Sequence, residues 1–193
     1  MTFDGLILAG GKSSRMGRDK AFLLIDGKPL WEIQAERLRK VGIETIYLSR
    51  HSSDHCLFPG VRTILDPVLP DDLSHKGPLA GLVSALERME STHLVVLAVD
   101  LPNMTEHFLK KLMGLTTEQC GVVPQSKNGL FEPLAATYPK GLYDLALAQL
   151  TGGQLALQTL VKNAIAKGLV TPMNLIEQDL SLFKNWNSSE DLT

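Results

Sequence analysis

The stretch LILAGGKSSRMGRDKAFL, from Leu6 to Leu23, joins a short apolar run to two glycines and a loop rich in basic side chains. Residues 5–9 read GLILA and predict a short strand that is buried on both faces. Gly10 and Gly11 follow it directly, and because they lack a Cβ atom, backbone N–H groups there can approach a phosphate closely. The stretch therefore predicts a strand that delivers an anion-binding loop.

The basic residues of this loop suit phosphate groups. Arg15 can hold phosphate oxygens with two parallel hydrogen bonds, and Lys20 supplies a compact positive charge. The spacing differs from a Walker A loop, since Met16 stands five residues after Gly11 with no Gly-Lys-Ser/Thr behind it, and it differs from the G-x-G-x-x-G dinucleotide fingerprint. The alternative is a merely exposed basic loop, but loops that follow strands in α/β sheets often bind ligands.

Length and composition indicate one globular domain, residues 1–193, of the cytoplasm. The 193 residues are 44% hydrophobic and 21% charged, and the formal net charge of −2 argues against a nucleic-acid or acidic-membrane partner. Cys56 and Cys120 have no paired spacing, which fits a reducing compartment. The amino-terminal residues do not resemble a signal peptide, and no run approaches the roughly 20 apolar residues of a membrane helix.

Strand-like apolar runs alternate with stretches of helical period, which predicts a layered α/β fold. Strands are expected over residues 5–9, 45–49, 62–66, 93–99 and near 169–173. Helices are expected to begin at Pro29 and Pro78, to include 108–112, and to cover 142–150 and 155–161. Asn128-Gly129 lies between two extended runs and predicts a hairpin. We therefore expect a mainly parallel sheet in which the hairpin adds an antiparallel edge.

Asp100 directly follows HLVVLAV (residues 93–99), the run that most strongly predicts a buried strand. Ligands of open α/β sheets bind at the carboxyl ends of the strands, and Mg²⁺ takes one or two carboxylates while it keeps several waters. We interpret Asp100 as a Mg²⁺ ligand beside bound phosphates. The alternative is that Asp100 caps the helix expected from near Met104.

Two further features leave alternatives open. Asp66, at the end of an expected strand, either contacts a ribose or base or is an ordinary turn aspartate before Pro67. The small-residue helix start GPLAGL, residues 77–82, includes Pro78 and Leu79. It either packs a helix N-terminus against a nucleotide or is ordinary helix-start chemistry.

Asn185 and Asn187 flank Trp186 near the carboxyl terminus. On a strand these two amides would point to the same face, where they could bind a polar substrate. The alternative is turn and cap chemistry. His51 and His55 have a spacing that resembles metal ligands, but they lie in a polar loop and do not predict a metal site.

Together these motifs resemble the molybdenum cofactor guanylyltransferases. The resemblance spans nearly the whole chain and rests on Leu8-Ala9-Gly10-Gly11, Arg15-Met16-Gly17, Asp19-Lys20, Gly77-Pro78-Leu79-Ala80-Gly81, Asp100 and Asn185-x-Asn187. The Leu-Ala-Gly-Gly version is similar to the guanylyl branch, whereas the cytidylyl relatives tend to carry Leu-Ala-Ala-Gly. The resemblance implies a Rossmann-like three-layer nucleotidyltransferase fold and the transfer of GMP from GTP to molybdopterin, with Mg²⁺ as cofactor and pyrophosphate as product.

The resemblance also implies roles for individual residues. The catalytic residues would be Arg15, Lys20 and Asp100, the last as the metal ligand; the nucleotide-binding residues would be Leu8, Ala9, Gly10, Gly11, Lys20, Asp66, Pro78 and Leu79; and Asn185 and Asn187 would bind the acceptor. The implied partners are GTP and molybdopterin, with proteins that deliver or accept the cofactor. Nucleic acids and membranes are not implied.

Two other functions fit the same residues. One is a related nucleotidyltransferase that uses CTP or activates another phosphorylated acceptor, such as a sugar or polyol phosphate. The other is a non-catalytic module that binds a nucleotide or a partner. The presence of Arg15, Lys20 and Asp100 together favours an enzyme, because a binding module has less need of a metal-binding carboxylate.

Overall fold

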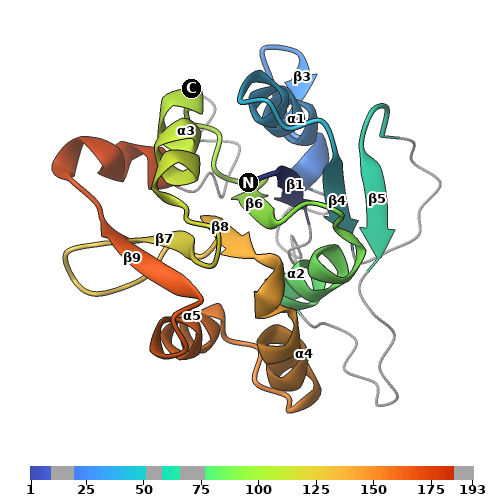
Figure 1. The fold of residues 1–193 in the computed structure, drawn as a ribbon. Helices are drawn as coiled ribbons and strands as arrows, with labels where there is room; N and C mark the ends of the chain where they lie inside the picture. The colour runs from blue at the N-terminus through green and yellow to red at the C-terminus, as the bar shows by residue number, and fades with distance from the viewer. Residues whose placement is uncertain (10–19, 51–57, 66–76, 185–193) are drawn as a thin grey trace.

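The computed structural model describes residues 1–9, 20–50, 58–65 and 77–184, and its central feature is a five-stranded sheet in the order β5-β4-β1-β6-β8. Its strands are β1 (Phe3–Leu8), β4 (Ile46–Arg50), β5 (Arg62–Leu65), β6 (His93–Ala98) and β8 (Ala135–Pro139). β1 pairs in parallel with β4 and β6, and β4 pairs in parallel with β5, whereas β8 is antiparallel to β6 (Figure 1). The predicted mainly parallel sheet with an antiparallel edge is confirmed.

Helices cover both faces of this sheet and make three layers. They are α1 (Leu30–Lys40), α2 (Gly77–Arg88), α3 (Glu106–Leu115), α4 (Tyr143–Thr151) and α5 (Leu157–Ala166). Successive residues of a strand point to opposite faces, so β1 serves two cores. Leu6 and Leu8 pack in the core with α2, α4 and α5, whereas Ile7 packs in the core with α1 and α3. This alternation places β1 and β6 at the centre of the molecule.

A short hairpin with a tight turn precedes α1. The short strands β2 (Leu24–Ile25) and β3 (Lys28–Pro29) pair around Asp26 and Gly27, whose φ angles are 50° and 79°. Two consecutive positive φ angles are typical of the tight turns that join hairpin strands. Pro29 keeps an extended backbone, so α1 begins at Leu30, one residue later than predicted.

The predicted hairpin around Asn128-Gly129 forms only next to its turn, where Gln125 and Phe131 make an isolated antiparallel bridge, and its longer strand pairing is wrong. The turn itself forms, because the Gly129 N–H donates to the Ser126 carbonyl at 2.9 Å and Gly129 has a φ of 83°. However, β7 (Gly121–Gln125) pairs in parallel with β9 (Val170–Asn174), and β8 pairs with β6. The antiparallel edge of the five-stranded sheet is therefore β8 alone.

β7 crosses closely over β8 and does not form a ladder with it. A Cβ atom built on Gly121 would lie 2.1 Å from the carbonyl oxygen of Thr137, so only glycine permits the approach. The next residue, Val122, donates its N–H to the Thr137 side-chain oxygen at 2.8 Å. The Val122 N–H of β7 is therefore hydrogen-bonded to a side chain of β8, whereas in a hairpin it would pair with a backbone carbonyl.

The carboxyl-terminal third agrees with the expected elements apart from their bounds. α4 and α5 begin one and two residues later than predicted, and Gly153, with a φ of 74°, lies in the break between them. β9 confirms the strand expected near residues 169–173.

The 3₁₀ helices η1 (Lys20–Phe22), η2 (Lys140–Leu142) and η3 (Glu177–Phe183) were not predicted. Over the described residues, none of the helices has the length and apolar character to cross a membrane.

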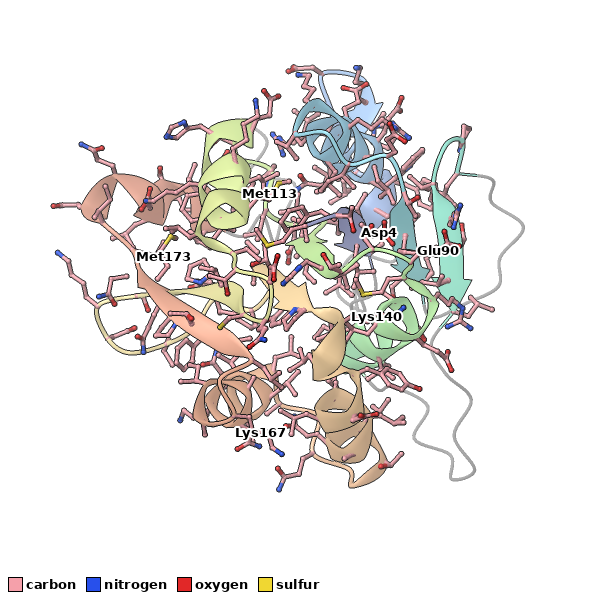
Figure 2. The ribbon with its side chains drawn as sticks, in the orientation of Figure 1. Asp4, Glu90, Met113, Lys140, Lys167 and Met173 are labelled. Carbon is pink, nitrogen blue, oxygen red and sulfur yellow. The ribbon has the colours of Figure 1, made fainter. Side chains whose placement is uncertain are left out.

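Polar contacts join the elements at the amino-terminal edge of the sheet. The Asp4 carboxylate accepts from the Glu90 N–H at 3.1 Å, and the Lys140 ammonium donates to the Met89 carbonyl at 2.8 Å. A hollow of about 590 Å³ at this edge is lined in part by Glu90, Lys140 and Lys167, which Figure 2 labels. These contacts hold the start of β1. Among the described residues that were singled out from the sequence, Leu8, Ala9 and Asp100 lie at the opposite edge.

Candidate active site at the carboxyl edge of the sheet

The carboxyl ends of β1, β4 and β6 meet at one edge of the sheet because these strands are parallel. The Val99 N–H donates to the Leu8 carbonyl at 3.1 Å, and the Ala9 N–H donates to the Ser49 carbonyl at 3.2 Å. Val99 immediately precedes Asp100. The residues Leu8 and Ala9, which lead into the glycine loop, therefore lie beside the turn that carries Asp100.

Asp100 lies in a turn that begins where β6 ends, and its side chain is partly exposed. The Leu101 N–H donates back to the Ala98 carbonyl at 3.4 Å. The alternative that Asp100 caps the following helix is wrong, because α3 begins at Glu106 and Thr105 is its N-cap. The Thr105 side-chain oxygen accepts from the Phe108 N–H at 3.2 Å. The carboxylate of Asp100 is therefore not used as the cap of α3.

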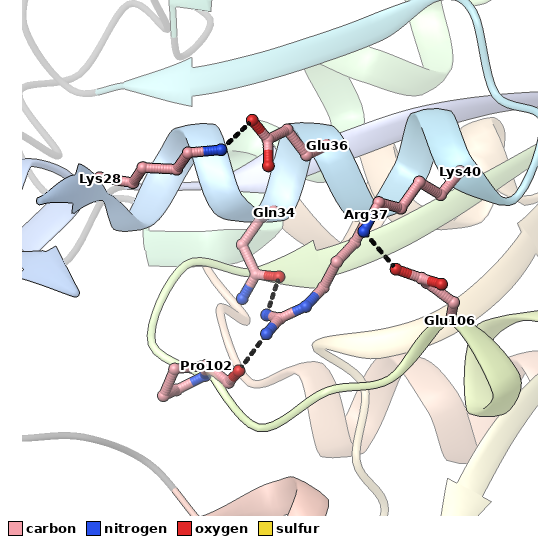
Figure 3. Close-up of polar contacts among 7 residues, drawn as sticks. All are labelled: Lys28, Gln34, Glu36, Arg37, Lys40, Pro102 and Glu106. Carbon is pink, nitrogen blue, oxygen red and sulfur yellow. Dashed lines mark hydrogen bonds and ion pairs between the residues drawn. The ribbon is translucent and has the colours of Figure 1, made fainter. Parts of the chain in front are cut away.

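Two residues of α1 hold this turn, and the sequence predictions missed both. The Gln34 amide nitrogen donates to the carbonyls of Ala98 and Leu101, at 3.2 and 2.9 Å. The Gln34 amide oxygen accepts from Arg37 at 2.9 Å, and Arg37 also donates to the Pro102 carbonyl (Figure 3). A signal for Gln34 was present, because a lone polar residue occupies the apolar helix stripe between positions 30 and 38.

A buried arginine at the end of β4 packs against the segment that begins at Lys20. The Arg50 guanidinium carbon lies 5.7 Å from the centre of the Phe22 ring and 5.0 Å from that of Phe58. The two rings are 5.5 Å apart. Cation–π contacts of this kind stabilise a partly desolvated arginine. They fix Phe22, the last residue of η1, against the carboxyl end of β4.

The start of α2 packs tightly against the ends of β1 and β4. A Cβ atom on Gly81 would lie 2.3 Å from the Ser49 hydroxyl oxygen and 2.8 Å from Cδ2 of Leu8. Pro78 is partly exposed, whereas the Leu79 side chain is fully buried in the core. The close packing expected for this helix start is thus made with the sheet. A contact of Leu79 with a nucleotide would have to come from its backbone.

Replacing Gly81 with alanine is expected to destabilise the protein by about 1–3 kcal/mol, because an extra methyl group in a filled interface forces its neighbours apart. Gly114 is the matched control: it lies in α3 with open space around its Cα, so Gly114→Ala should stabilise by up to about 1 kcal/mol. Urea denaturation measures both free energies of unfolding. Equal effects of the two substitutions would contradict the packing described for α2.

Several predicted site residues lie outside the described residues: Gly10, Gly11, Arg15, Asp66, Asn185 and Asn187. For Lys20, the structure describes the backbone as the first residue of η1 and not the side chain. Of the residues it describes, the structure brings Leu8, Ala9 and Asp100 together, with the start of α2 packed behind the strands. The remaining site residues stay predictions.

Burial shifts the pKa of two charged groups near the end of β6. It lowers the pKa of the Arg37 guanidinium, and Glu106 opposes this effect. It also raises the pKa of the Glu132 carboxyl group. Glu132 stands two residues before Leu134, whose carbonyl accepts from the Ala98 N–H at 2.8 Å. Burial is the largest cause of both shifts.

Asp100 supplies a carboxylate at this edge that could bind a metal ion. Among the residues that the structure describes, no group of three or more His, Cys, Asp and Glu side chains could hold a metal ion. A closed protein-only cage for Ca²⁺ or Zn²⁺ is not formed by them. One partly exposed carboxylate, Asp100, does fit Mg²⁺, which is commonly held by one or two carboxylates together with waters and substrate phosphates.

An open, mainly parallel sheet in which β1 ends beside the acidic turn after β6, with two glycines next in the sequence after Ala9, is typical of a nucleotide-binding α/β protein. Residues 5–167 match the family model of the MobA-like NTP transferase domain, and the chain belongs to this family of nucleotidyltransferases. The fold, the enzyme class and the resemblance expected from the sequence are thereby confirmed.

Relatives match along most of the chain. A probable molybdenum cofactor guanylyltransferase of Opitutus terrae is 32% identical over 190 residues, which cover 97% of this chain and 91% of the relative. A molybdenum cofactor guanylyltransferase of Xanthomonas euvesicatoria is 35% identical over 117 residues, 60% of this chain and 56% of the relative.

Solved structures confirm the fold alone, because their sequences are more distant. The molybdopterin-guanine dinucleotide biosynthesis protein A of Archaeoglobus fulgidus has a TM-score of 0.71 at 20% identity, covering 98% of this chain and 94% of its own. A 4-diphosphocytidyl-2C-methyl-D-erythritol synthase of Anaerococcus prevotii has a TM-score of 0.69 at 12% identity, covering 99% and 92%. The same three-layer fold is thus found in proteins named for different nucleotides.

Proposed function

We propose that the protein transfers GMP from GTP to molybdopterin and releases pyrophosphate. The observation that carries the proposal is the hydrogen bond from Val99 to Leu8, because it joins the turn of Asp100 to the strand that leads into the glycine loop. Relatives named as molybdenum cofactor guanylyltransferases, one matching over 97% of the chain, support guanine as the base and molybdopterin as the acceptor.

The reaction forms one P–O bond and breaks another. A phosphate oxygen of the acceptor attacks the α-phosphorus of GTP, and the bond from this phosphorus to the bridging oxygen breaks as pyrophosphate departs with the electron pair. The attacking phosphate is already anionic, so the site needs no strong general base and no covalent intermediate. Catalysis of such transfers is mainly alignment and neutralisation of charge.

The residues at the edge divide these tasks. The segment from Leu8 to Gly11 would cradle the nucleotide, with the N–H groups of the two glycines toward its phosphates, and the cations of Arg15 and Lys20 would neutralise charge on the α-phosphate and the pyrophosphate. Asp100 would hold Mg²⁺ together with waters and phosphate oxygens. The bound ion would supply further neutralisation of phosphate charge.

The remaining predicted residues would select the two substrates. Asp66, with Pro78 and the backbone of Leu79, would contact the nucleoside. The amides of Asn185 and Asn187 would hold the polar acceptor. Proteins that deliver molybdopterin or accept the finished cofactor are the partners that this function requires.

Nucleotide preference distinguishes the proposed guanylyltransferase from a transferase that uses another nucleotide and from a non-catalytic module. With Mg²⁺ and molybdopterin, we expect GTP to support pyrophosphate release with a kcat/KM at least about tenfold above that of CTP, ATP or UTP, because the bases differ in their hydrogen-bonding edges. A preference for CTP would instead indicate a cytidylyltransferase. Tight GTP binding without pyrophosphate release would indicate a non-catalytic module.

A further inference from the structure

The Gln34 side chain is a buried polar group with a complete set of partners. None of its surface is exposed, and it lies in the core layer between the sheet and α1. A buried amide destabilises a protein unless its hydrogen bonds are formed. Here both N–H bonds go to carbonyls of the β6–α3 turn, and the oxygen accepts from Arg37. The amide therefore links α1 to a turn more than sixty residues further along the chain.

Arg37 extends this contact beyond the turn. One nitrogen of its guanidinium group binds the Gln34 oxygen, and another donates to the Pro102 carbonyl (Figure 3). The planar group keeps its charge and its fixed fork when half-buried, which a lysine would not. Next to it on the same helix, Lys40 forms an ion pair of 3.0 Å with Glu106 in the first turn of α3.

The carbonyls held by α1 lie on both sides of Asp100. Ala98 stands two residues before it, and Leu101 and Pro102 are the two residues after it. On its other side the turn is held by the bond from Val99 to Leu8. Asp100 is thus presented from a short segment whose backbone is tied to α1 and to β1.

The hydrogen bonds from Gln34 and Arg37 are not needed to start α3, because Thr105 already caps that helix. They do fix the position of the turn that carries Asp100, and the position of a Mg²⁺ ligand matters because Mg²⁺ demands near-ideal octahedral geometry at short distances. Groups that orient a metal ligand without touching the metal typically change metal affinity or activity 10–100-fold when they are removed.

We propose that Gln34 and Arg37 act as positioning residues that hold the Asp100 carboxylate for the metal ion and thereby set the metal affinity of the enzyme. This inference rests on the proposed function, in which Asp100 is the metal ligand. The two side chains, here called the α1 clamp, touch the backbone around Asp100 and take no part in the transfer itself.

The test compares metal dependence in three variants. Gln34→Met removes all three hydrogen bonds at similar volume, and Arg37→Lys keeps the charge but loses the fork. Glu36→Gln is the control on the same helix, since it removes an exposed ion pair of 2.7 Å with Lys28 (Figure 3). We expect the half-saturating Mg²⁺ concentration for GMP transfer to rise about tenfold in Gln34→Met, to rise less in Arg37→Lys, and to stay unchanged in Glu36→Gln.

A binding measurement without turnover separates position from stability. Electron paramagnetic resonance with Mn²⁺ as the probe, at saturating GTP and without acceptor, should show the same loss of metal affinity as the Mg²⁺ titration. Unchanged Mn²⁺ and Mg²⁺ affinities in both clamp variants, with only a lower Tm, would overturn the inference and leave the proposed function standing. Failure of the unaltered protein to bind Mn²⁺ with GTP, or to transfer GMP, would overturn both.

Discussion

Replacing Asp100 with asparagine is expected to lower the rate of GMP transfer by about 10²-fold or more while the fold survives. Asparagine keeps the shape of the side chain and removes the charge that would hold Mg²⁺. Thr105, and not Asp100, caps α3. The α1 clamp binds backbone carbonyls on both sides of Asp100 and holds the turn. Steady-state pyrophosphate release measures the rate, and thermal denaturation measures the fold.

Glu118→Gln is the matched control for Asp100. Glu118 is an exposed carboxylate that lines the hollow at the opposite edge of the sheet. Its replacement removes the same charge from the protein and should leave GMP transfer unchanged. A near-normal rate in Asp100→Asn would show that the metal is held elsewhere. An equal loss in both variants would show that net charge, rather than a metal ligand, is responsible.

Replacing Lys20 with alanine is expected to lower GMP transfer by about 10²-fold, because its positive charge would neutralise the triphosphate as pyrophosphate departs. The neighbours of Lys20 hold the segment in place: Ala21 is fully buried, and Phe22 packs against Phe58 and Arg50. Steady-state kinetics would show a lower kcat for the reaction, whereas the Tm should stay close to that of the unaltered protein.

Lys28→Ala is the control for Lys20. Lys28 is exposed and pairs with Glu36 on the surface of α1, and surface ion pairs of this kind contribute little to stability. Its removal should affect neither kcat nor the KM for GTP. A Lys20→Ala variant with unchanged kcat and KM would exclude this residue from the phosphate site.

Strongly patterned segments made the fold largely predictable from the sequence. Residues 5–8 of β1 and 94–98 of β6 are continuous apolar runs, and such runs indicate strands that are covered on both faces. Pro29 and Pro78 marked the starts of α1 and α2 to within one residue. The position of Asp100 followed from the same reasoning, because the residue after a central parallel strand lies at the ligand-binding edge.

The pairing of β7 could not be predicted from local sequence. Asn128-Gly129 correctly indicated a turn, but strand pairing is decided by contacts between segments distant in the chain. β7 and β9 each contain a proline, Pro124 and Pro172, which has no N–H for a central ladder, and they pair with each other outside the main sheet. The close approach of Gly121 to Thr137 is likewise visible only in three dimensions.

The site residues that directly follow strands were predictable from the sequence. The residues of α1 that bind the backbone of the site were not. Asp100, Leu8 and Ala9 were singled out by their position, and the hydrogen bond from Val99 to Leu8 places the turn of Asp100 beside the end of β1. Gln34 and Arg37 were missed because their partners are backbone carbonyls, which have no sequence signature. A polar residue on an otherwise buried helix stripe was the available signal.

Transfer of label from GTP to the acceptor tests the central claim most directly. The protein would be mixed with GTP labelled at the α-phosphate, Mg²⁺ and molybdopterin, and the products would be separated. We expect the label in a dinucleotide of GMP and molybdopterin, with one pyrophosphate released for each dinucleotide formed, and no transfer when Mg²⁺ is chelated. Label that remains in GTP, or that appears only in free GMP or GDP, would contradict the assignment as a guanylyltransferase.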